Sequence, residues 1–248
     1  MARHKPAAEG GYQRGEETRA RIVEAAIAVF GERGYEGAST RDIANAAGVN
    51  APALQYYFDG KEGVYLECVE HLIALMWRMM GDTVEAAERT LADENTNDQA
   101  LIEAALGMLS AVVSTIQDST RATALRAFLD RHQAGLCPES ASMAFEERFK
   151  RRVGTVIRLL IARLSGLAVD DERTIIHSMA LFTQGLAFRV QKPKLLEALK
   201  WTEINQKEME LVRGVVLTQA RFTLEGLVRE RDLRSGGQNP PLFLQTPF

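Results

Sequence analysis

Residues 39–61 read STRDIANAAGVNAPALQYYFDGK and decide the fold, because they encode two short helices separated by a glycine turn. Ser39 or Thr40 can cap the first helix by accepting a backbone hydrogen bond, and Asp42 suits the positive end of its dipole. Gly48 stands where a helix end favours a left-handed residue. We therefore predict a helix-turn-helix, an arrangement typical of DNA-binding proteins.

The second of these helices has the pattern of a recognition helix. Asn50 can cap it, and Pro52 lies in its first turn, where a missing N–H leaves no hydrogen bond unmade. Leu54 and Phe58 fall on one side and are expected to be buried. The remaining positions are expected either to face the DNA groove or to support the helix. They are Ala51, Pro52, Ala53, Gln55, Tyr56 and Tyr57.

An amphipathic segment from Glu17 to Arg33 precedes this pair and completes a three-helix module. Its apolar residues recur at three- and four-residue spacing, and Gly34 ends the helix. The apolar residues are Ile22, Ala25, Ala26, Val29 and Phe30.

The stretch ARIVEAAIAVFGERGYEGASTRDIANAAGVN, followed by ALQYYFDGKEGVYLECV, resembles the N-terminal domain of the TetR family of bacterial transcriptional regulators. The resemblance is specific over residues 16–69. It implies an all-α fold in which a three-helix DNA-binding domain precedes a larger helical domain that binds a ligand and dimerises. Within the family, the whole chain is most similar to regulators that respond to antibiotics or other small toxic molecules.

We expect four parts along the chain: a flexible arm, a DNA-binding domain, a ligand-binding and dimerisation domain, and a tail with a late apolar patch. Their bounds are 1–15, 16–62, 63–232 and 233–248, and the apolar patch contains Leu242, Phe243, Leu244 and Phe248. After Phe58 the chain reads as helical, with a first long helix through Met80. Further helices are predicted at about Asp98–Gln117, Thr120–Gln133, Met143–Leu164, Glu172–Val190 and Glu208–Arg231, with a break at Gln191–Pro193.

The composition of the 248 residues is that of a globular protein, since 46% are hydrophobic. The net charge of −3 means that DNA binding would rest on a few aimed contacts rather than on a basic coat. No apolar run approaches the roughly 18 residues of a membrane span, and the start MARHKPAAEGG lacks the apolar segment of a signal peptide. We expect a cytoplasmic protein whose two cysteines, Cys68 and Cys137, are buried thiols.

The resemblance implies that Thr40, Arg41, Tyr56, Tyr57 and Lys61 contact the DNA backbone or bases. Hydroxyl, phenol and ammonium groups suit phosphate oxygens, whereas a guanidinium can reach guanine O6 and N7. Family members commonly carry a tyrosine where this chain has Gln55, and glutamine can pair with adenine. The full predicted DNA-contacting set is Thr40, Arg41, Asn50, Ala51, Pro52, Gln55, Tyr56, Tyr57 and Lys61. Alternatively, individual side chains of this set are only a solvated helix face.

The last two long helices carry more apolar surface than one small bundle covers, which predicts a homodimer. The resemblance implies a four-helix interface there. The residues assigned to it are Ile175, Gly185, Phe188, Val215 and Phe222. Gly185 and Gly214 each weaken a helix and are expected to permit close helix approach. The alternative is that these residues fill the core of one subunit.

The middle helices carry bulky apolar residues beside a few ionisable ones, which predicts a pocket for an apolar or amphipathic organic effector. The candidate ligand-binding residues are Trp77, Met80, Met108, Arg126, Phe128, His177, Phe182 and Gln184. Arg126 is the candidate partner of an anionic or carbonyl group. Each apolar member can equally be a core residue. His71, His132 and His177 lack paired metal spacing, so we expect neither a metal nor a cofactor.

The sequence contains no glycine-rich phosphate loop, nucleophile elbow or HExxH motif, so an enzyme is not expected. We predict a dimeric repressor that binds a palindromic operator in double-stranded DNA and leaves it when a small organic molecule enters the larger domain. A helical protein–protein adaptor is the alternative from a different class. The sequence leaves open the effector, the operator and an activator role.

Overall fold

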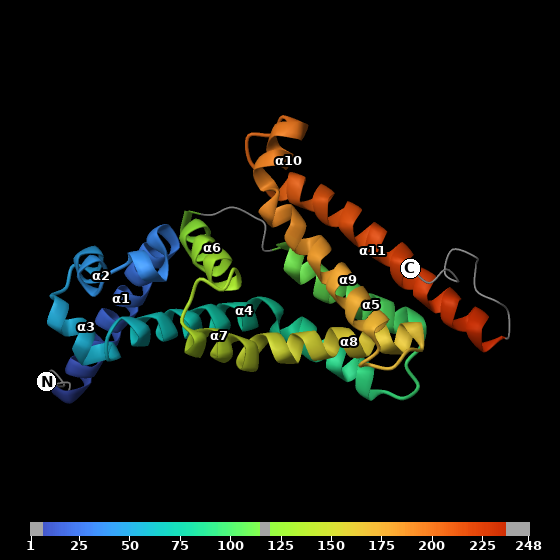
Figure 1. The fold of residues 1–248 in the computed structure, drawn as a ribbon, viewed down its shortest axis with the longest axis horizontal. Coiled ribbons are helices and arrows are strands. Elements are labelled where there is room, and N and C mark those ends of the chain that lie inside the picture. The colour runs from blue at the N-terminus through green and yellow to red at the C-terminus, as the bar shows by residue number, and fades with distance from the viewer. Residues whose placement is uncertain (1–6, 115–119, 237–248) are drawn as a thin grey trace, which may run out of the picture. The chain divides into compact units, whose positions relative to one another are not determined.

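The computed structural model describes residues 7–114 and 120–236, and every regular element within these ranges is a helix, which confirms the predicted all-α class (Figure 1). No helix in the described part of the chain combines the length and apolar character needed to cross a membrane. The elements are α1 (Ala7–Gly37), α2 (Thr40–Ala47), α3 (Ala51–Phe58), α4 (Lys61–Ala92), α5 (Asp98–Val113), α6 (Thr120–Gln133), α7 (Glu139–Phe145), the π-helical turn η2 (Glu146–Lys150), α8 (Arg151–Ser165), α9 (Glu172–Val190), α10 (Lys192–Leu199) and α11 (Gln206–Ser235).

The chain forms two compact units, and each is interrupted in sequence by the other. The head unit contains residues up to 76 and residues 119–150, and the body unit contains residues 77–118 and the chain from 151 onward. This division differs from the predicted boundary at residue 62, because the first half of α4 and the whole α6–α7 segment belong with α1.

In the head unit, α1 packs against α2 and α6, and α2 packs against α3. Ile22, Ile43 and Leu54 are buried there, as their spacing predicts. α1 begins at Ala7, so residues 7–15, which we expected to be a flexible arm, are helical. Helix α1 is kinked at Gly34, whose φ of 75° and ψ of 174° are not helical.

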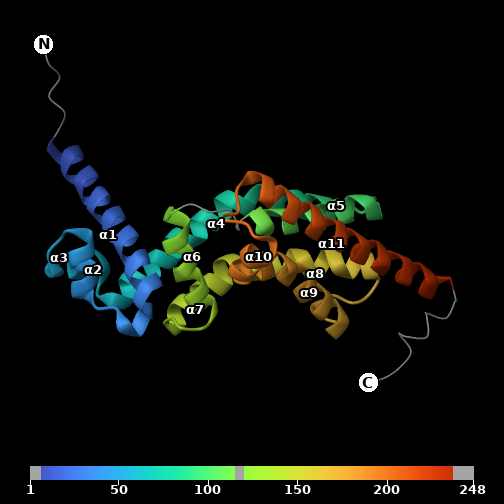
Figure 2. The same cartoon turned by 90° about the horizontal axis from the view of Figure 1, so that it is seen from above.

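The body unit is a layered bundle in which α5 packs against α8, α9 and α11 (Figure 2). Leu101, Leu109 and Val113 of α5 are almost fully buried. Gly185 of α9 is buried against this helix, since a Cβ atom placed there would lie 3.0 Å from Val112 Cγ1. Gly185 therefore allows α9 to approach α5 closely within the body unit. This place differs from the predicted one at a dimer interface.

Several helix ends follow the sequence pattern and others do not. The bounds of α6 and α9 are those predicted. The predicted break at Gln191–Pro193 is instead the start of helix α10, because proline is well tolerated in the first helical turn, where Pro193 lies. The predicted helix from Met143 to Leu164 begins earlier, at Glu139, and contains the π-helical turn η2. The apolar patch predicted in the tail, Leu242–Phe248, lies outside the described residues.

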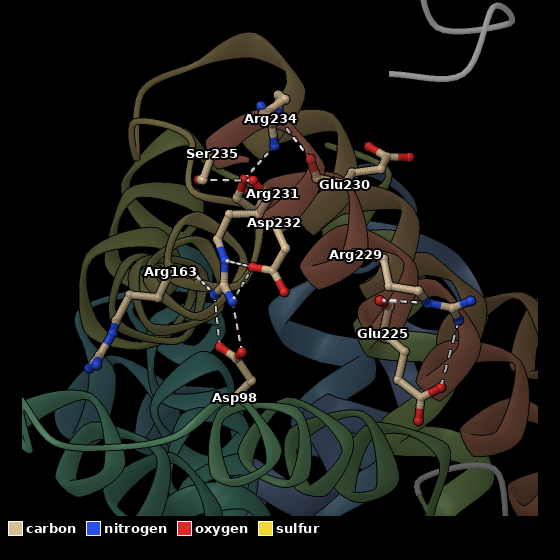
Figure 3. A network of polar contacts seen from close by, with 10 residues as sticks. Asp98, Arg163, Glu225, Arg229, Glu230, Arg231, Asp232, Arg234 and Ser235 are labelled. Carbon is tan, nitrogen blue, oxygen red and sulfur yellow. Dashed lines mark hydrogen bonds and ion pairs between the residues drawn. The ribbon is translucent and has the colours of Figure 1, made fainter. Parts of the chain in front are cut away.

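A polar network closes one end of the body unit (Figure 3). The Arg231 guanidinium donates to both carboxylate oxygens of Asp98, at 2.8 and 2.7 Å, and also to the Arg163 carbonyl. Arg234 donates to the Ser165 carbonyl, and Arg163 donates to the Leu91 carbonyl. Arginines thus satisfy carbonyls that the ends of α4 and α8 leave without helical partners. Hydrogen bonding from Arg231 lowers the pKa of the Asp98 carboxyl below its ordinary value.

We expect Arg231→Ala to lower the free energy of unfolding by about 1–2 kcal/mol, because it removes the bidentate ion pair with Asp98, which is only partly exposed to solvent. The side chains of Arg231 and Asp98 are 25% and 39% exposed. The matched control is Arg229→Ala on the same helix, whose side chain is 71% exposed and pairs within one helical turn with Glu225 (Figure 3). Its cost is expected to stay within about 0.5 kcal/mol. Urea unfolding at unchanged m-value measures both, and equal midpoints for the two variants would contradict the assignment.

Candidate nucleic-acid interface

The first helix of the predicted helix-turn-helix, α2, starts with a reciprocal cap. Ser39 Oγ accepts from the Asp42 backbone N–H, and the Asp42 carboxylate accepts from the Ser39 backbone N–H. The pKa of the Asp42 carboxyl is lowered first by the hydrogen bond that the Ser39 hydroxyl donates to it, then by the Ser39 backbone N–H, and also by the Arg33 guanidinium 2.8 Å away. The helix ends at Gly48, whose φ of 64° is the left-handed conformation expected there. Of the two candidate caps, Ser39 is therefore the one used.

The second helix, α3, presents an exposed face opposite two buried anchors. Leu54 and Phe58 are buried, whereas Tyr56 is 83% exposed. Asn50 caps the helix by accepting from the Ala53 backbone N–H at 3.1 Å. The other exposed residues of this face are Ala51, Pro52 and Gln55, with Tyr57 half-buried beside them. The division between anchor and exposed positions is that of a helix able to enter a DNA groove.

The polar side chains predicted to read DNA differ in how they are held. Arg41 on α2 is exposed, and Thr40 is half-buried at the start of the same helix. The Gln55 amide donates to the Asp59 carboxylate at 3.2 Å, one helical turn away. The rings of Tyr56 and Tyr57 meet edge to face, with centroids 5.0 Å apart. Gln55 and the two tyrosines are thus partly oriented before any partner arrives.

Lys61, in the first turn of α4, has partners that the sequence did not indicate. Its ammonium donates to the carbonyls of Tyr35 and Ala38, at 2.9 and 3.2 Å, and lies 4.2 Å from the centroid of the Tyr35 ring. The first turn of α4 stands beside the end of α1, where carbonyls lack helical partners, and this explains the contact. Lys61 therefore has partners inside the head unit, and its contact with phosphate stays a prediction.

The residues predicted to bind an effector are divided between the two units. Trp77, Met80, Met108, His177, Phe182 and Gln184 belong to the body unit, and Arg126 and Phe128 belong to the head unit. Phe128 is fully buried, with its ring centroid 4.9 Å from that of Tyr65, so it is a core residue of the head unit. Trp77 lies under the Arg152 guanidinium, 5.0 Å from the ring centroid, and Arg152 is fixed by two hydrogen bonds to Glu88.

Gln184 differs from the other effector candidates because its side-chain oxygen is buried and accepts no hydrogen bond from any described residue. A buried acceptor without a donor costs about 1–3 kcal/mol. In the part of the chain that the structure describes, no three His, Cys, Asp or Glu residues lie close enough together to hold a metal ion.

An apolar surface lies exposed on α9 and α11. Val215 and Phe222, both assigned to a dimer interface, are 47% and 64% exposed, whereas Ile175 and Phe188 are half-buried. The other large apolar residues exposed on these two helices are Ile176, Met179 and Leu211.

Two residues of α6 have a structural importance that the sequence pattern did not indicate. Arg131 donates to the carbonyls of Gly31 and Glu32, both at 2.8 Å. His132 is buried, with Nδ1 3.5 Å from the Tyr65 hydroxyl, and burial lowers its pKa to about 4. Both contacts join positions far apart in the chain, so no local pattern could have identified them.

Two family models match the chain. One, described as "Bacterial regulatory proteins, tetR family", matches residues 22–68, and the other, described as "HTH-type transcriptional dual regulator CecR, C-terminal domain", matches residues 101–227. The HTH-type transcriptional dual regulator CecR of Shigella flexneri is 32% identical over 215 residues, which cover 86% of this chain and 94% of that protein. The probable HTH-type transcriptional regulator YttP of Bacillus subtilis is 34% identical over 84 residues, 34% of this chain and 39% of that protein.

Solved structures share the fold at low sequence identity. AibR, solved in complex with isovaleryl coenzyme A and operator DNA, aligns with a TM-score of 0.58 at 16% identity, over 82% of this chain and 97% of that chain. A TetR-family transcriptional regulator from Bordetella parapertussis aligns with a TM-score of 0.55 at 18% identity, over 82% of this chain and 93% of that chain.

Proposed function

Because the chain belongs to the TetR family of bacterial transcriptional regulators, we propose that it is a homodimeric, effector-responsive repressor of a palindromic operator. The protein is a DNA-binding transcriptional regulator. The proposal that α3 enters the major groove and reads DNA bases is supported by the exposed face of this helix. Since the similar protein from Shigella flexneri is named a dual regulator, a reporter assay of this protein should score activation as well as repression.

The exposed α3 face, with Arg41 beside it, supports a division between base reading and anchoring. Gln55 carries a bidentate amide suited to adenine, and Arg41 carries a fork suited to guanine. Tyr57 is half-buried at the end of the helix, where a phenol can bind a phosphate oxygen.

We expect Gln55→Ala, or Arg41→Ala, to lower affinity by about 1–3 kcal/mol at particular base pairs. Tyr57→Ala is the control and should weaken binding to operator and scrambled DNA alike. The measurement is fluorescence anisotropy with the protein's own promoter DNA and a scrambled duplex at several salt concentrations. Equal losses on both duplexes would remove Gln55 from the base readers. If the native protein gave no salt-sensitive, sequence-dependent binding, the adaptor alternative would replace the proposal.

The exposed apolar residues of α9 and α11 support a dimer. Ile176 and Met179 are 62% and 66% exposed on α9, and Leu211 is 57% exposed on α11. Such residues at helical spacing on neighbouring elements form a continuous surface that a second copy can cover. Dimerisation also suits DNA binding, because two recognition helices can then reach successive major grooves.

We expect Phe222→Glu to produce a monomer with little loss of monomer stability, because Phe222 is 64% exposed in the single chain. Burying an unpaired carboxylate at an interface costs about 3 kcal/mol or more, which weakens association roughly a hundredfold. Leu136→Glu is the control, since Leu136 is 57% exposed but lies in the head unit. Sedimentation equilibrium at micromolar concentration should show a dimer for the native chain and the control. A dimeric Phe222→Glu variant would exclude this face.

For the effector we propose an apolar or amphipathic organic molecule held in the body unit, near Gln184. Met80 and Met108 supply flexible apolar surface in this unit. The buried Gln184 oxygen supplies an acceptor that a ligand N–H or O–H can satisfy. The solved complex of AibR, a protein of the same fold, contains isovaleryl coenzyme A, so acyl thioesters belong among the first compounds to test.

We expect at least one compound among short-chain acyl coenzyme A thioesters, aromatic acids and hydrophobic drugs to raise the melting temperature, with stabilisation growing as ligand concentration exceeds the dissociation constant. Gln184→Leu should not destabilise the unliganded protein, because it removes a buried acceptor without a donor, but it should reduce the ligand-induced shift. Thr183→Val, at the neighbouring exposed position on α9, is the control. An unchanged shift in Gln184→Leu would exclude this site, and no shift with any compound would contradict the effector class.

A further inference from the structure

The end of α1 and the residue that follows it, Gly31–Ala38, which we call the α1 corner, are held by two cations from other helices. The chain leaves helical geometry at Gly34 and turns into α2, which starts at Thr40. A helix end exposes carbonyl oxygens that no later N–H can satisfy, and it also carries partial negative charge. Cationic donors are therefore the natural partners of this corner.

Two cations from different parts of the chain supply these donors. Arg131 on α6 donates to the carbonyls of Gly31 and Glu32 through two N–H groups of its fork. Lys61 on α4 donates to the carbonyls of Tyr35 and Ala38. Together they bind four carbonyls between Gly31 and Ala38, two by each cation.

The position of these two cations follows the path of the chain. Helix α4 begins in the head unit and passes into the body unit between residues 76 and 77. The α6–α7 segment is also joined to the body unit, at both of its ends, between residues 118 and 119 and between residues 150 and 151. The two cations of the α1 corner therefore belong to α4, which continues into the body unit, and to α6, whose segment is joined to the body unit at both ends.

Helix α6 packs closely against α1. A Cβ atom at Gly31 would lie 2.8 Å from the Ala124 carbonyl oxygen and 3.2 Å from the Phe128 backbone nitrogen, so the two helix backbones are in direct contact. The Phe128 ring packs against Phe30 and Tyr65, with centroid distances of 6.4 and 4.9 Å. If α6 slid along α1, both Arg131 hydrogen bonds would lose their geometry.

We propose that Arg131 is a positioning residue for DNA reading. Its guanidinium holds the α1 corner, and with it α2, in the orientation that presents α3 to the groove, and it makes this orientation depend on α6. Removing Arg131 lowers the fraction of protein in the reading conformation, and apparent affinity falls in proportion to that fraction. The inference rests on the proposed DNA reading by α3, but the conformational part can be measured without DNA.

The experiment compares Arg131→Ala with the native full-length chain. We expect faster amide hydrogen exchange in residues 31–47 without DNA, and about tenfold weaker binding to the protein's own promoter DNA. The slope of log affinity against log salt concentration should stay unchanged. This slope depends on how many DNA phosphates the protein neutralises, and Arg131 is not proposed to contact a phosphate. Lys61→Ala should accelerate exchange in the same residues, because it removes the other half of the support.

Arg148→Ala is the matched control. It removes an arginine from the same inserted segment, where Arg148 pairs with Glu70 of α4, and it should leave the exchange of residues 31–47 as in the native chain. Arg131→Lys guards against misfolding of the alanine variant, because it keeps the charge but replaces the fork by one ammonium. Its exchange rates should fall between those of the native chain and Arg131→Ala.

Native-like exchange in residues 31–47 of Arg131→Ala would overturn the proposal. Weaker DNA binding with a reduced salt slope and unchanged exchange would also overturn it, because that pattern identifies a direct phosphate contact. If the native chain bound no promoter DNA, the proposed DNA reading would fail, and exchange alone would still decide whether Arg131 holds the corner.

Discussion

The absence of a side chain at Gly31 determines how closely α1 and α6 approach, and much of the head unit depends on that contact. A single Cβ atom would come within 2.8 Å of the Ala124 carbonyl oxygen, which real structures do not allow without a shift of the backbone. Because the two backbones are in contact, the Phe128 ring reaches Phe30 of α1. For the same reason Arg131 reaches the Gly31 and Glu32 carbonyls of α1. A segment embedded in the sequence of the body unit thereby becomes part of the head unit.

Helix α6 also contributes to a buried aromatic cluster that fixes the charge state of His132. The imidazole lies among Tyr65, Phe128 and Phe145, and burial, with a smaller contribution from Lys150, lowers its pKa from 6.5 to about 4. The folded protein therefore keeps this ring neutral near pH 7. As the pH falls below 6.5, the unfolded chain binds the proton first, so the contribution of the cluster to stability decreases until the folded ring also titrates near pH 4.

The sequence predicted those features that depend on residues a few positions apart. The cap at Ser39, the left-handed Gly48 and the buried Leu54 all follow from spacing within one or two turns, and the structure contains each of them. The same reasoning could assign bounds to α6, but a helical pattern shows which face is apolar and not which helix covers it. Phe128 was therefore assigned to a ligand pocket, although it packs in the core of the head unit.

Long-range polar contacts were the other feature beyond reach of the sequence. Lys61 follows a family position associated with phosphate, and nothing near it in sequence indicates the Tyr35 and Ala38 carbonyls, which lie 26 and 23 residues earlier. Gly185 was correctly expected to permit close helix approach, but its partner is α5 of the same unit rather than a second copy. In each case the residue type was informative and the partner was set by the tertiary fold.

The two cations at the α1 corner are not equivalent, and their chemistry indicates which of them depends more strictly on the geometry of the corner. Lys61 carries a compact charge on a flexible stem, so its ammonium can follow a carbonyl that moves by a small distance. Arg131 binds through a planar fork to two carbonyls of consecutive residues, and both bonds depend on the same plane. A displacement of α6 along α1 would therefore disturb both Arg131 hydrogen bonds together, whereas the Lys61 ammonium can keep one carbonyl partner while the other moves.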